Sequence, residues 1–198
     1  GKYQPIPGEA NMESNTVRIP TYKFRGELYT DTTELVQALA SDWDNGKKQL
    51  YRGLLTGFFM ACDPEIAEAC MDAEDSVTKH GENEDVAFWK LLYKMAPGMN
   101  ALFWKNQKYE SLNAFGTDLM EKLRGGNVEE CPMWNEMLSY GLISSYMKAH
   151  RFSEAQVKGA ESIESSVRLN KANAKTMALN YYLLAYLISG DQIGRAHV

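Results

Sequence analysis

In the segment Tyr22-Lys23-Phe24-Arg25-Gly26-Glu27-Leu28-Tyr29, aromatic and polar residues alternate around a glycine. This pattern is typical of a short β-hairpin with a tight turn. Asp31 follows, and its carboxylate can cap the first turn of a helix, with Glu34 three residues later as in a capping box. The sequence therefore predicts a hairpin that leads directly into a helix.

Four helices are predicted after this hairpin, because apolar residues recur at helical spacing in four successive stretches. The first begins at Asp31 and is expected to end at Asn45-Gly46, since glycine and asparagine commonly end helices. The second follows this stop, with an apolar stripe that includes Leu54 and Phe58. The third is expected from about Pro64 to Lys79, and the fourth from about Glu84 to Met95. The helical faces of the whole chain predict burial of Trp43, Leu54, Phe58, Trp89, Leu92, Leu119, Leu142, Tyr182 and Leu183.

The same pattern begins again later in the chain. At an offset of 80 residues, Phe24 aligns with Trp104 and Tyr29 with Tyr109. The later helices align at larger offsets, in the same order: 90 residues for Glu74–Val77 with Glu164–Val167, and 93 for Phe88–Tyr93 with Tyr181–Tyr186. Loop insertions would produce this gradual increase. The sequence thus predicts a mainly α protein of two tandem repeats, residues 22–98 and 99–192, each a short β-hairpin followed by about four helices.

The two ends differ from the repeats. Residues 1–21 contain prolines and no apolar periodicity, which predicts a linker or an extended arm. Residues 193–198 match what a short-read sequencing adapter encodes in one reading frame, so they are predicted to be an artefact outside the fold. The last natural helix, around Tyr181–Ile188, is apolar nearly all round. We therefore expect an exposed apolar patch along it, and a third hairpin after Gln192 in the natural protein.

Composition excludes several classes of function. The chain has 198 residues, 44% of them hydrophobic, and 21 basic against 26 acidic side chains give a net charge of −5. This acidic balance argues against nucleic-acid binding, which needs a clustered basic face. No apolar run reaches the 18–20 residues that a membrane span requires, so no membrane partner is expected. Three cysteines without a C-x-x-C pair indicate reduced thiols in a cytoplasmic protein.

The aromatic pattern also resembles a known kind of region. Its elements are Phe24-x-Gly26-x-x-Tyr29, then Trp43, then Leu50-Tyr-Arg-Gly53-Leu-Leu55, then Phe88-Trp-Lys-Leu-Leu-Tyr93. Together they resemble a helical repeat region of gut Firmicutes proteins, which occurs alongside DnaK-type chaperone ATPases or serine/threonine kinases. The resemblance covers residues 22–190 and implies a structural module. It carries over no catalytic residue, because neither a phosphate-binding loop nor a kinase triplet is present.

No residue is assigned to catalysis, to a cofactor or to a metal. Carboxylates cluster around Asp72 and again at residues 82–85, but such runs are usually solvated helix faces or partners of the helix dipole. Cys131 stands at an expected helix start, yet the nearest histidine after it, His150, lies nineteen residues away across a helix. We read the cysteines as buried or incidental thiols.

The expected function is therefore binding. We expect a non-catalytic helical repeat module of a larger bacterial cytoplasmic protein, which binds a protein partner or regulates an attached ATPase or kinase domain. The alternative is a substrate-binding accessory region of an enzyme chain. Aromatic residues are enriched where proteins bind each other. The candidate interaction surface comprises Tyr22, Tyr140, Tyr181 and Leu184.

Overall fold

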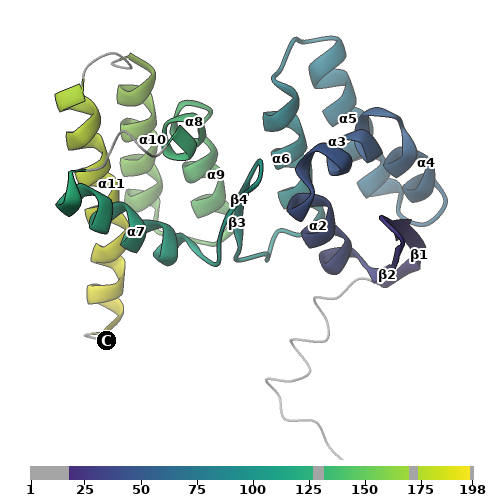
Figure 1. Ribbon diagram of the computed structural model, residues 1–198, viewed down its shortest axis with the longest axis horizontal. Helices are drawn as coiled ribbons and strands as arrows, with labels where there is room; N and C mark the ends of the chain where they lie inside the picture. The colour runs from purple at the N-terminus through teal and green to yellow at the C-terminus, as the bar shows by residue number, and fades with distance from the viewer. Residues whose placement is uncertain (1–17, 127–131, 170–173, 197–198) are drawn as a thin grey trace, which may run out of the picture. The chain divides into compact units, whose positions relative to one another are not determined.

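The computed structural model describes residues 18–126, 132–169 and 174–196, and over these residues the protein is mainly helical (Figure 1). The described elements are ten helices and two short antiparallel hairpins. The chain divides into two compact units, residues 1–99 and 100–198. This division falls one residue after the predicted end of the first repeat.

The first unit opens with the hairpin of β1 (Arg18–Phe24) and β2 (Glu27–Asp31), in which Tyr22 pairs with Tyr29. The strand starts four residues earlier than predicted, so residues 18–21 belong to the hairpin and not to an arm, and Ile19 is buried. Residues 1–17 of the predicted arm lie outside the described residues. Five helices follow: α2 (Thr32–Ser41), α3 (Trp43–Tyr51), α4 (Leu54–Met60), α5 (Pro64–Thr78) and α6 (Glu84–Met95).

The second unit has the same order of elements. Its hairpin is β3 (Leu102–Trp104) with β4 (Gln107–Tyr109). Five helices follow here too: α7 (Leu112–Gly125), α8 (Pro132–Ser139), α9 (Leu142–Ala149), α10 (Glu154–Leu169) and α11 (Ala174–Ala196). The side chains of residues 193–198, predicted to be an artefact, lie outside the described ones.

Both hairpins lead into a capped helix, as predicted. The first turn residue has a positive φ in each hairpin, 52° at Arg25 and 53° at Lys105, which suits the tight turn between twisted strands. The Asp31 carboxylate accepts a hydrogen bond from the backbone N–H of Glu34 at 2.9 Å. The Ser111 hydroxyl caps α7 in the same way, accepting from the N–H of Ala114 at 3.1 Å.

The predicted helix stop at Asn45-Gly46 is wrong. The helix ends at Ser41, the next helix begins at Trp43, and Gly46 lies inside α3. Its reason for being glycine is close packing, because a Cβ at this position would stand 2.3 Å from the carbonyl oxygen of Leu39 and 3.0 Å from the ring of Phe88. Such a contact between helices looks the same in the sequence as a helix stop.

The predicted second helix is in fact interrupted. Gly53 takes a left-handed conformation with φ 77° between α3 and α4, and this conformation favours glycine. The interruption changes which face of α4 is buried, so Leu54 is 50% exposed and Phe58 is half-buried, against the prediction. The described residues of each unit form five helices, one more than predicted.

The core of each unit is built on an edge-to-face pair of aromatic rings. In the first unit Trp43 packs against Phe88 at 4.8 Å between ring centroids, and its Nε1 donates to the Asp85 carboxylate at 2.7 Å. In the second unit Trp134 packs against Tyr181 at 5.6 Å. The structure confirms the predicted burial of Trp43, Trp89, Leu92, Leu119 and Leu142, and contradicts it for Tyr182 and Leu183.

Candidate functional site

Three of the four predicted surface residues are buried, so this part of the prediction is wrong. Tyr22 packs edge-on against Phe58 at 4.9 Å, and its hydroxyl donates to Gln49 at 2.5 Å. Burial, with a smaller contribution from the Cys70 thiol, raises the pKa of Tyr22 to about 12. Tyr181 is 1% exposed and Leu184 is fully covered.

Tyr140 is the one predicted residue that reaches solvent. It is 42% exposed, and its ring lies 5.9 Å from that of Trp104. It follows α8 and precedes Gly141, which takes a left-handed conformation at the start of α9. A single exposed aromatic ring beside a core tryptophan is common on protein surfaces and does not form a patch.

An exposed apolar surface lies on α11, on the side away from Tyr181 and Leu184. Its members are spaced three, four and seven residues apart, so they form one stripe along the helix. We call this set the α11 stripe: Leu179, Tyr182, Leu183 and Tyr186, exposed by 58, 45, 49 and 74%. The expectation of an exposed apolar patch on this helix is confirmed, with different members.

Two close approaches decide which face of α11 is buried. At Gly116 of α7, a Cβ would meet the side chain of Ile188 at 2.9 Å. At Gly159 of α10, a Cβ would meet Leu187 at 3.1 Å. Tyr181 adds a hydrogen bond from its hydroxyl to the Asn135 side chain. These contacts fix the inner face of α11 and leave the α11 stripe on the exposed face.

The charges along the α11 stripe are few. Lys175 stands one turn before Leu179 and is exposed, and Ser189 follows Tyr186 on the same exposed side. The sequence from 174 to 189 holds no aspartate or glutamate, although the chain as a whole has a net charge of −5. The stripe is therefore an apolar, acid-free strip on an acidic protein.

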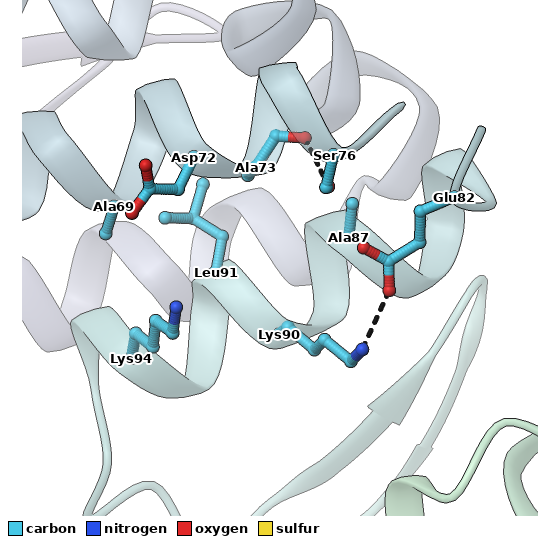
Figure 2. A pocket seen from close by; sticks show the side chains of 9 residues that line it. All are labelled: Ala69, Asp72, Ala73, Ser76, Glu82, Ala87, Lys90, Leu91 and Lys94. Carbon is cyan, nitrogen blue, oxygen red and sulfur yellow. Dashed lines mark hydrogen bonds and ion pairs between the residues drawn. The ribbon is translucent and has the colours of Figure 1, made fainter. Parts of the chain in front are cut away.

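A small pocket with charged residues in its lining lies between α5 and α6 (Figure 2). Its volume is about 210 Å³, and Lys90 and Glu82 form an ion pair of 2.7 Å at one end, with Asp72 and Lys94 at the other. Burial alone would raise the pKa of Glu82, but hydrogen bonds from Lys90 and Ser76 and the lysine charges hold it below its usual value. The pocket thus contains an ion pair that neutralises itself.

The thiols of the first unit are poor nucleophiles. Burial, and then the nearby Glu74, raises the pKa of Cys70 to about 12. Burial and the neighbouring Asp63 also raise the pKa of Cys62, which is half-buried. Both thiols stay protonated at neutral pH, and the thiolate is the reactive form. Cys131 lies outside the described residues.

A buried carboxylate organises the second unit. Glu164 on α10 is 2% exposed, and its Oε2 accepts a hydrogen bond from the backbone N–H of Ser144 at 3.1 Å. The helix that begins there has Gly141 as its first cap and so lacks a side-chain cap of its own. Burial raises the pKa of Glu164, and the hydrogen bonds from Ser144 oppose this rise without cancelling it. Glu164 therefore supplies the missing cap from another helix.

We expect this raised pKa to make the second unit less stable as the pH rises. The carboxyl group has a higher pKa in the folded than in the unfolded state, so its contribution to stability is complete below the unfolded value of 4.5 and is lost through the folded value. Glu164→Gln removes this titration. In urea unfolding, the free energy of unfolding of the variant relative to that of the native chain should therefore increase as the pH rises from 4.5 through the folded pKa. Glu154→Gln, at an exposed position of the same helix, serves as the control. This role would be contradicted if the native chain became more stable relative to Glu164→Gln as the pH rises.

The described part of the chain contains no candidate metal site and no candidate membrane span. No group of three or more histidine, cysteine or acidic side chains there could hold a metal ion. No described helix is both long and apolar enough to cross a membrane. No protein-family model, curated protein or solved structure matches this chain.

Proposed function

We propose that this chain is a non-catalytic helical module made of two tandem copies of one unit, and that the α11 stripe is its protein-binding surface. The module belongs to a larger bacterial protein of the cytoplasm. There it binds a protein partner or regulates an attached ATPase or kinase domain, in line with the resemblance of its aromatic pattern to regions beside such enzymes.

A short motif at the same place in each unit supports the duplication. Gly53-Leu-Leu-Thr56 starts α4, and Gly141-Leu-Ile-Ser144 starts α9, with the glycine left-handed in both. In the first unit the Thr56 hydroxyl donates to Glu74 on α5 at 2.8 Å. In the second unit the N–H of Ser144 donates to Glu164 on α10 at 3.1 Å. Glu74 and Glu164 also align with each other in the sequence, so each motif contacts the equivalent glutamate of its own unit.

The single observation that carries the binding role is the exposure of the α11 stripe. Contiguous apolar side chains on a soluble surface mark sites of interaction more often than scattered ones do. Tyrosine is favoured in such sites, because it buries a large ring and keeps a hydroxyl for hydrogen bonding. The stripe contains two tyrosines, Tyr182 and Tyr186, one turn apart.

The first unit offers a comparison for the same positions. Trp89 and Tyr93 on α6 align with Tyr182 and Tyr186, and they are only 2 and 6% exposed. An aromatic pair is thus present in both helices but buried in one alone. Tyr182 and Tyr186 thus keep the aromatic character of the aligned pair but are exposed, which leaves them accessible to a partner.

Photo-crosslinking in the cells that produce the protein tests this function. A photoreactive amino acid at position 186 should give discrete covalent adducts with protein, because Tyr186 is the most exposed member of the stripe. The matched control carries it at position 28, since Leu28 is similarly exposed at 66% but lies on the β-hairpin of the first unit. Adducts at neither position, or equal adducts at both, would contradict the proposal.

A further inference from the structure

We draw no further inference here: the strongest candidate, the exposed apolar face of α11 as the docking site of one particular partner, carries nothing beyond the proposed binding role, because nothing in the structure shows what covers it.

Discussion

Replacing Gly46 with alanine is expected to lower the unfolding free energy of the first unit by about 3 kcal/mol or more. The added Cβ would lie 2.3 Å from the Leu39 carbonyl oxygen, and backbone cannot turn aside as a side chain can. The neighbouring Phe88 ring, at 3.0 Å, also packs edge-on against Trp43 and is fully buried. Relief of the clash therefore requires α2 and α3 to separate.

Gly57→Ala is the matched control, because it makes the same change in α4 where no atom would lie within 4 Å of the new Cβ. This variant should gain up to about 1 kcal/mol, since alanine favours a helix more than glycine does. Urea unfolding combined with amide hydrogen exchange measures both variants. A Gly46→Ala protein as stable as Gly57→Ala would show that α2 and α3 do not approach closely at this position.

The sequence predicts the parts of the fold that local chemistry determines. The bounds of α6 match the predicted range, because Asn83 caps its start and the chain turns after Met95. α5 ends one residue before the predicted end and begins where Pro64 predicts. Both hairpins and the caps at Asp31 and Ser111 follow from side chains that act within three or four residues.

Long-range contacts determine what the sequence could not show. The glycine at 46 serves a close approach between helices, whereas Gly53 serves a left-handed turn. In the sequence both are simply glycines near the end of an apolar stretch. The sequence predicts a helix stop at Gly46 and a continuous helix through Gly53, which reverses their roles. The predicted number of helices is too low because the interruption at Gly53 divides α3 from α4.

The candidate site was also predictable from the sequence only in part. The apolar character of α11 predicts an exposed patch, but the residues assigned to the surface, Tyr181 and Leu184, are the buried ones. A helix that is apolar on all sides gives no signal for its inner face. That face is set by Gly116 and Gly159 on other helices, through contacts with Ile188 and Leu187. Only Lys175 and Ser189, polar and exposed at the two ends of the stripe, indicated the outer side.

Neighbouring tyrosines on α11 differ strongly in their exposure to solvent. Hydroxyl-radical labelling of the native chain in dilute solution should modify Tyr182 and Tyr186 rapidly and Tyr181 slowly. Tyr182 is 45% and Tyr186 is 74% exposed, against 1% for Tyr181. A side chain as buried as Tyr181 reacts only when the structure opens, so the difference in rate should be on the order of tenfold or more. Labelling in urea, where all three should react alike, controls for intrinsic reactivity.

Residue-resolved mass spectrometry of this labelling decides whether the α11 stripe is the outer face of its helix, as its binding role requires. Tyr182 and Tyr186 should be heavily modified, and Tyr181 should be protected. Modification of Tyr181 as fast as that of Tyr182 would contradict that role, since α11 would then present another face to solvent.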